Sequence, residues 1–145
     1  MPHADPIVSL ARTIRRLEVA WLLASDRQDF LAALHLGGEL IAAGDEFRQL
    51  APVSNEGAAV LLREVAETTM LDAHEYGDAA AASMARTTRR VARAVKRDAY
   101  SARDIADLRA LLPVAERMDD VGTSGLAAEL RKVIAWLARP RAVAS

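Results

Sequence analysis

The chain has 145 residues, no cysteine and a formal net charge of −1. This length is enough for one domain with its own core, so we expect a single domain over residues 1–145. The lack of cysteine excludes disulfides, thiolate metal sites and cysteine nucleophiles, and it fits a soluble protein of the cytoplasm. The near-neutral total charge argues against nucleic-acid binding over the whole surface.

The composition favours helices. Hydrophobic residues make up 52% of the chain and aromatic residues only 4%, a balance that is typical of helices packed over small side chains. No segment alternates in polarity like a strand, and the longest leucine-rich stretch near the start, residues 19–24, is too short to cross a membrane. We therefore predict an all-α fold, a single-domain antiparallel helical bundle of five or six helices built on the first four.

Two helices are predicted before residue 51. The first begins at Asp5-Pro6, where an N-cap residue precedes a proline at the first helical position, and it ends near Ala24. The second covers about residues 30–50 and is apolar around most of its circumference. Its polar strip is therefore narrow.

His35 and Glu39 lie on this strip one turn apart, where they would form a weak ion pair at low pH. A histidine on a helical bundle is also the arrangement of histidine phosphotransfer domains, so phosphotransfer through His35 is one alternative function. Those domains usually carry Lys and Gly three and four residues later, whereas Gly38 and Glu39 occupy these positions here. The pair Gly37-Gly38 destabilises a helix, so we expect either close approach of another helix or a kink or break.

A third helix is predicted from its N-cap, Ser54, to about residues 74–77. Residues 52–67 read PVSNEGAAVLLREVAE. This segment resembles the approximate pattern P-x-[ST]-x-x-G-x-A-A-x-L-L-R-x-V-A-E of small bacterial all-α proteins without assigned activity, which often start with Asp-Pro-Ile, as residues 5–7 do here. The resemblance implies a small helical protein and no particular chemistry, and it does not extend past Asp78.

The fourth predicted helix, about residues 78–100, is amphipathic and strongly basic on one face. Residues 1–72 hold 6 Lys and Arg against 11 Asp and Glu, whereas residues 73–145 hold 13 against 9. We expect carboxylates within the protein, above all those of the acidic half, or carboxylates across a dimer to meet this face; nucleic-acid binding through residues 86–97 is the alternative. The arginines of this face are the candidate interaction surface: Arg86, Arg89, Arg90, Arg93 and Arg97.

Two further helices are predicted in the C-terminal third. Ser101 and Asp104 are spaced as in a capping box and open the first of them, which Pro113 is expected to kink or divide. The last helix is predicted through Leu126, Leu130, Val133, Ile134 and Leu137, and it ends before Pro140. Residues 122–125 between the two are expected to form a turn; a helix start can bind an anion, but this one lacks the length and the lysine of a P-loop.

No catalytic motif is recognisable. The sequence has no Glu-x-x-His pair of a di-iron bundle and no Gly-x-Ser-x-Gly elbow, and Ser54, Ser101 and Ser124 fall where helix caps are needed. His74 is placed to complement a helix dipole. We therefore predict a non-enzymatic protein without metal or cofactor that acts away from membranes, through contact with another protein or with itself as a homodimer.

Overall fold

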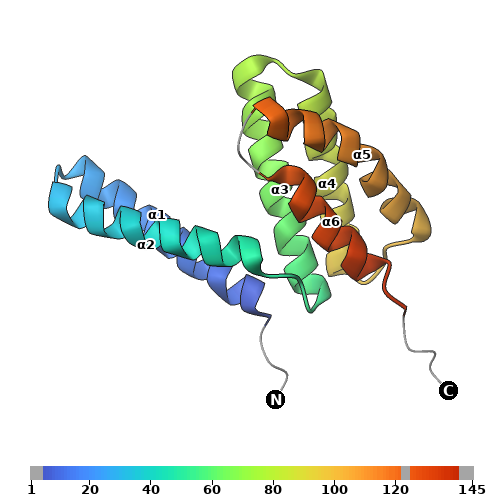
Figure 1. The fold of residues 1–145 in the computed structure, drawn as a ribbon, viewed down its shortest axis with the longest axis horizontal. Coiled ribbons are helices and arrows are strands. Elements are labelled where there is room, and N and C mark those ends of the chain that lie inside the picture. Colours follow the sequence, from blue (N-terminus) through green and yellow to red (C-terminus); the bar gives the residue numbers. More distant parts are fainter. Residues whose placement is uncertain (1–4, 122–124, 141–145) are drawn as a thin grey trace. The chain divides into compact units, whose positions relative to one another are not determined.

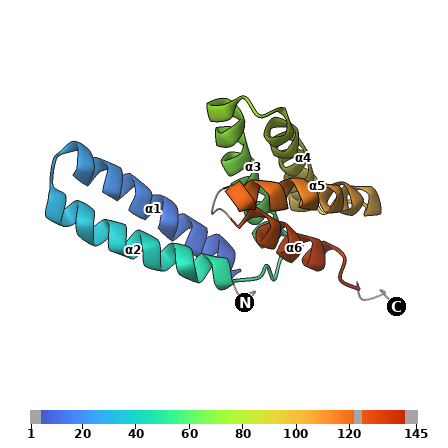
Figure 2. The same cartoon turned by 45° about the horizontal axis from the view of Figure 1, so that its top comes forward.

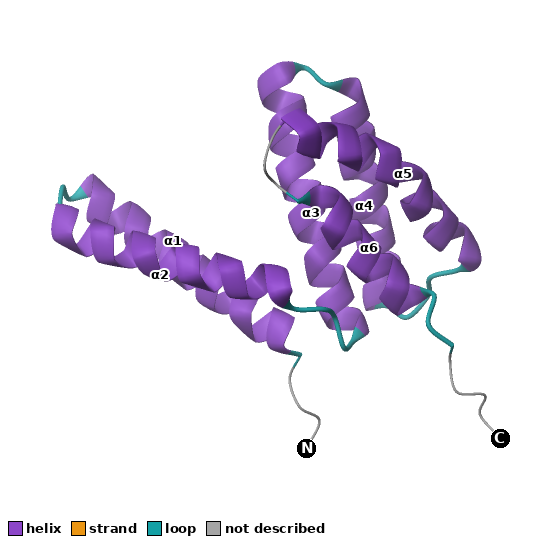
Figure 3. Cartoon of the chain, viewed as in Figure 1, coloured by secondary structure: helices purple, strands orange, loops and turns teal. Residues whose placement is uncertain are grey.

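The computed structural model describes residues 5–121 and 125–140. In this part of the chain the backbone forms six helices and no strand, which confirms the predicted all-α fold (Figure 3). None of the described helices is long and apolar enough to span a bilayer. The helices, labelled in Figure 1, are α1 Pro6–Asp26, α2 Phe30–Gln49, α3 Asn55–Tyr76, α4 Ala79–Lys96, α5 Ala102–Val121 and α6 Leu126–Leu137.

The chain forms two compact units, residues 1–51 with α1 and α2, and residues 52–145 with α3 to α6. In the second unit α3 packs on α4, α6 packs on α3, α5 packs on α4, and α5 and α6 pack on each other. The bundle is therefore built on the last four helices, and its predicted construction from the first four is wrong. The prediction of a single domain over residues 1–145 stays a prediction.

The first unit is a hairpin of two antiparallel helices (Figure 2). Asp5 caps α1 as predicted, because its Oδ1 accepts a hydrogen bond of 3.0 Å from the amide of Ile7. Asp29 caps α2 in the same way, with 3.2 Å between its Oδ1 and the amide nitrogen of Ala32. Gln28 turns the chain between the helices in the left-handed region, with φ of 56°.

The Gly37-Gly38 pair lies inside a continuous α2, so the helix does not break there. A Cβ placed on Gly37 would meet Nε1 of Trp21 at 3.7 Å, because the indole of α1 lies against this glycine. This distance is ordinary van der Waals contact, so an alanine would also fit at position 37, and the predicted close approach does not by itself require this glycine. Around Gly38 no described atom lies within 4 Å of such a Cβ, so close approach does not explain the second glycine.

The second unit has an apolar core between its four helices. Ser54 caps α3 as predicted, and Gly77, at φ of 63°, ends α3 before Asp78 caps α4. The fully buried large side chains come from all four helices and include Leu61, Leu62, Met84, Leu108, Leu130 and Val133.

Two buried threonines lie in the core of the second unit. Thr69 of α3 and Thr88 of α4 have no exposed surface. Each hydroxyl donates to the carbonyl one turn earlier on its own helix, at 2.8 Å to Val65 and 2.9 Å to Met84. Each buried hydroxyl therefore has its hydrogen-bond acceptor within its own helix.

One helix boundary and the predicted division at Pro113 differ from the structure. α4 ends at Lys96 rather than near Tyr100, because Arg97 forms the C-cap and Asp98 takes a positive φ of 53°. α5 continues through Pro113 and is not divided there. α5 begins at Ala102, and Asp104 makes one bond of the predicted capping box, since its Oδ2 accepts from the amide of Ser101 at 3.0 Å.

A carboxylate of α5 caps the start of α6. The amide of Leu126 donates to Oδ1 of Asp119 at 2.8 Å, and that of Ala127 donates to Oδ2 at 2.9 Å. The N-terminus of α6 therefore already binds a carboxylate of the same unit. The predicted cap residue Ser124 lies outside the described residues.

Candidate functional site

The arginine face of α4 does not form one site. Arg90 reaches α5, with 2.8 Å between Nη1 and Oδ1 of Asp104 and 2.7 Å between Nη2 and Oδ2 of Asp107. The hydrogen bond to Asp107 is the main cause that raises the pKa of the Arg90 guanidinium, and the bond to Asp104 adds to it. Arg90 therefore joins two helices of the same unit. Carboxylates within the protein meet Arg90, as predicted, but they come from α5, which packs on α4, and not from residues 1–72.

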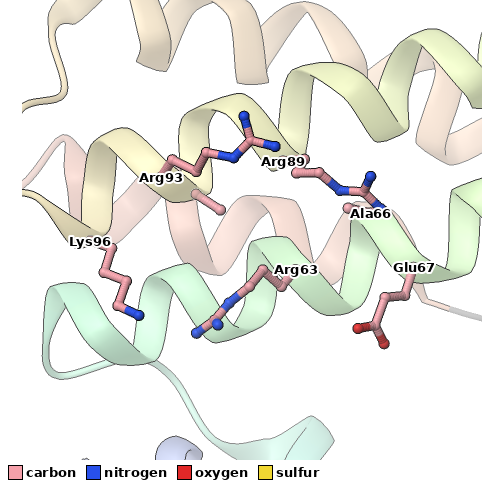
Figure 4. Close-up of a pocket in the computed structure, with 7 residues that line it drawn as sticks. Arg63, Ala66, Glu67, Arg89, Arg93 and Lys96 are labelled. Atoms are coloured by element: carbon pink, nitrogen blue, oxygen red, sulfur yellow. The ribbon is translucent and has the colours of Figure 1, made fainter.

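Two other arginines of this face line a hollow between α3 and α4 (Figure 4). Arg89 and Arg93 come from α4, and the hollow has a volume of about 280 Å³. Its floor contains two small, buried residues, Ala66 and Ala92. The charged residues around it, which we call the basic hollow, are Arg63, Glu67, Arg89, Arg93 and Lys96.

The basic hollow combines four cationic side chains with one carboxylate. Within the part of the chain that the structure describes, none of the four cations is in an ion pair. The Nε of Arg63 donates a long hydrogen bond of 3.4 Å to the carbonyl of Ala59 on its own helix. The hollow therefore carries an excess of positive charge that the described carboxylates do not offset.

Sequence reasoning found only part of this site. Lys96 lies seven residues after Arg89 and so shares its helix face, and the sequence already places it beside the five arginines. Arg63 belongs to α3, and only the packing of α3 on α4 brings it to the same hollow. The remaining predicted residues, Arg86 and Arg97, are exposed and do not line it.

A second candidate surface lies on the hairpin. Among the described residues of α1 and α2, four apolar side chains are buried, namely Ile7, Val8, Ala24 and Ala43. Twice as many large apolar side chains are exposed, and the exposed fraction reaches 83% at Leu31. We call this set the apolar hairpin surface: Val19, Trp21, Leu22, Leu23, Phe30, Leu31, Leu34 and Ile41.

The exposed residues of α2 follow a regular spacing. One seam of this helix, spaced alternately by three and four residues, is buried or half-buried: Ala33, Leu36, Leu40, Ala43 and Phe47. A second seam with alternating four and three spacing lies beside it: Phe30, Leu34, Gly37, Ile41 and Gly44. Its large side chains are 73%, 76% and 69% exposed. Because such a repeat is the pattern of helix–helix packing, α2 has one packed seam and one open seam.

The polar strip of α2 is placed as predicted. His35 is exposed, and its Nε2 lies 3.2 Å from Oε1 of Glu39 one turn later. His74 is exposed in the last turn of α3, where the dipole interpretation expected it. No group of three or more His, Asp and Glu within the described ranges is arranged to hold a metal ion.

Comparison of the whole chain with protein-family models, with curated proteins and with solved structures gives no match. The resemblance of residues 52–67 to small bacterial helical proteins thus stays a prediction. The buried positions of that segment, such as Leu61, Leu62 and Val65, are accounted for by packing of α3 in the core.

Proposed function

We propose that this protein is a non-enzymatic self-association protein whose N-terminal hairpin forms a four-helix bundle with the hairpin of a second copy. The observation that supports the proposal is the apolar hairpin surface, above all the open seam of α2. In water such a surface favours association, because exposed apolar area is the main driving force for protein contact.

The area of this surface fits a stable dimer. Its eight side chains are exposed by between 38% and 83%. Taking on the order of 150 Å² for each large side chain, the exposed part amounts to roughly 800 Å². A standard stable interface takes about 800 Å² from each partner. The hairpin thus offers about as much apolar area as one subunit of a dimer needs.

A second copy is favoured as the partner because the hairpin is half of an antiparallel four-helix bundle. The open seam places Phe30, Leu34 and Ile41 along one side of α2, whereas His35 and Glu39 lie on another side. Two hairpins related by a two-fold axis would bury the same seam on both copies and leave both polar strips in water.

The two alternatives from the sequence have less support. His35 contacts Glu39 on an open helix surface, which is an ordinary setting for a surface histidine. Arg90 is engaged by two carboxylates, so residues 86–97 do not present a continuous basic face to a nucleic acid. Neither observation favours phosphotransfer or duplex binding over self-association.

The test measures the mass of the full chain by sedimentation equilibrium over a concentration series. We expect the wild type to dimerise and Leu34→Asp to raise the dimer Kd at least about tenfold, since it places a charge in the apolar interface. Leu71→Asp is the matched control, because Leu71 of α3 is also exposed, at 68%. Circular dichroism of each variant checks that the helices remain.

Two outcomes would contradict the proposal. One is a wild type that stays monomeric at all accessible concentrations. The other is a dimer that Leu34→Asp and Leu71→Asp weaken equally, because the interface would then not be the open seam of α2.

A further inference from the structure

The basic hollow places four cations around one small space. Arg89, Arg93 and Lys96 follow one another by four and three residues on α4, and they span roughly 10 Å along its axis. Arg63 reaches the same hollow from α3 (Figure 4). Ala66 and Ala92 form the floor between the two helices, and their small side chains leave room above it.

The cations of the hollow differ from the neighbouring Arg90 in their ion-pair partners. That guanidinium is held by Asp104 and Asp107, whereas Arg89, the adjacent residue, has no ion pair with the described residues. Like charges around one hollow repel one another, and an anion bound among them would offset this repulsion. A guanidinium group can also donate two parallel hydrogen bonds to two oxygens of one phosphate. Such a pair recognises the geometry of the phosphate as well as its charge.

We propose that the basic hollow binds a compact polyphosphate, meaning two or three linked phosphate groups. The volume of about 280 Å³ suits a small ligand. Among the described residues no aromatic side chain lines the hollow, so none of them would stack on a base as in single-stranded nucleic-acid sites. A linear polyanion without bases fits both the length of the α4 row and the chemistry of its lining. This proposal does not depend on dimerisation of the hairpin.

Glu67 is expected to limit the affinity, because it places one negative charge among the four cations. The variant Glu67→Gln keeps the shape of the side chain and removes its charge. We expect it to bind a polyphosphate several-fold more tightly than the wild type does. A structural role of Glu67 alone would not produce this gain.

The experiment is isothermal titration calorimetry of the full chain with tripolyphosphate at physiological salt. A separate titration uses oligo-dT. We expect Arg89→Gln and Arg93→Gln each to weaken tripolyphosphate binding about tenfold, since each removes a charge-assisted hydrogen-bonding group. Arg86→Gln is the matched control. It removes the same charge from an exposed position of the same helix outside the hollow, and we expect it to change the Kd less than twofold.

Four results would overturn the proposal. They are no detectable binding of tripolyphosphate, equal weakening by Arg86→Gln and Arg93→Gln, no gain from Glu67→Gln, and tighter binding of oligo-dT through the same arginines. The second would indicate general surface charge, and the fourth would indicate a nucleic-acid site. Circular dichroism of every variant distinguishes loss of the site from loss of the fold.

Discussion

Both units consist of helices with large apolar side chains, but they bury these side chains to very different extents. In the α3–α6 unit, Leu61, Leu62 and Leu130 are completely buried. In the hairpin, Leu31 and Leu34 are 83% and 76% exposed. The difference comes from the number of helices, because two helices share one seam, whereas four enclose a core that each of them faces. Apolar periodicity along a helix therefore does not show whether its apolar face is covered.

This difference has a consequence for stability. Ordering a residue costs on the order of 1–2 kcal/mol of backbone entropy, and only burial and hydrogen bonding offset it. The α3–α6 unit has a core for this purpose, and the hairpin has few buried side chains. We expect the hairpin to depend on a partner and the α3–α6 unit to be stable without one.

The largest expected effect is a core truncation in the α3–α6 unit. Leu61→Ala should lower the free energy of unfolding by about 2–5 kcal/mol, because it leaves a cavity in a core with no exposed surface at that position. Leu71→Ala on the same helix, at an exposed position, should cost less than about 0.5 kcal/mol. Urea denaturation followed by circular dichroism measures both, and equal losses would contradict the assignment of the core.

The contribution of an ion pair to stability should also differ between the units. Arg90→Ala should destabilise by about 1–2 kcal/mol, because it leaves the buried Asp104 with fewer hydrogen bonds. Arg48→Ala in the hairpin removes an exposed pair with Asp45 and should cost about 0–0.5 kcal/mol. Denaturant midpoints of the two variants check the contrast. A larger loss from Arg48→Ala would show that the hairpin depends on its surface charges.

Dilution should distinguish the unfolding transitions of the two units. If the hairpin is stable only as a dimer, each tenfold dilution should destabilise it by about 1.4 kcal/mol, whereas the α3–α6 unit should not respond. Calorimetry at several protein concentrations should show one transition that shifts and one that does not. A single transition that is independent of concentration would instead support the prediction of one cooperative domain.

The smallest expected effect is a gain in the hairpin. Gly38→Ala should stabilise α2 by about 0.5–1 kcal/mol, because alanine is the better helix former and no described atom lies within 4 Å of the new Cβ. The thermal midpoint of the variant measures this change. A loss of stability would place a neighbour at Gly38, which would then be part of an interface.

Much of the fold follows from local signals in the sequence. Asp5, Ser54 and Asp104 mark helix starts because their side chains bind nearby backbone amides, and such contacts depend only on short spacings. The position of His35 beside Glu39 follows from helix periodicity in the same way. Local hydrogen bonding and periodicity can therefore be read from one sequence.

What could not be predicted depends on which helices become neighbours. The carboxylates that meet Arg90 come from α5 rather than from the acidic first half, and Arg63 joins Arg93 only because α3 packs on α4. α5 also tolerates Pro113, since losing one backbone hydrogen bond need not divide a helix that its neighbours hold in place. Tertiary packing decides these points, and the spacing of residues along the chain does not contain them.

The cap of α6 bears on the order in which the chain folds. α6 has 12 residues, about the length at which an isolated helix is marginal in water. Gly125 provides no side-chain cap for it, and the carboxylate of Asp119 on α5 binds its first amides instead. The segment therefore gains its cap only once α5 has formed and docked nearby. We expect α6 to appear late, as a product of assembly rather than as one of its starting points.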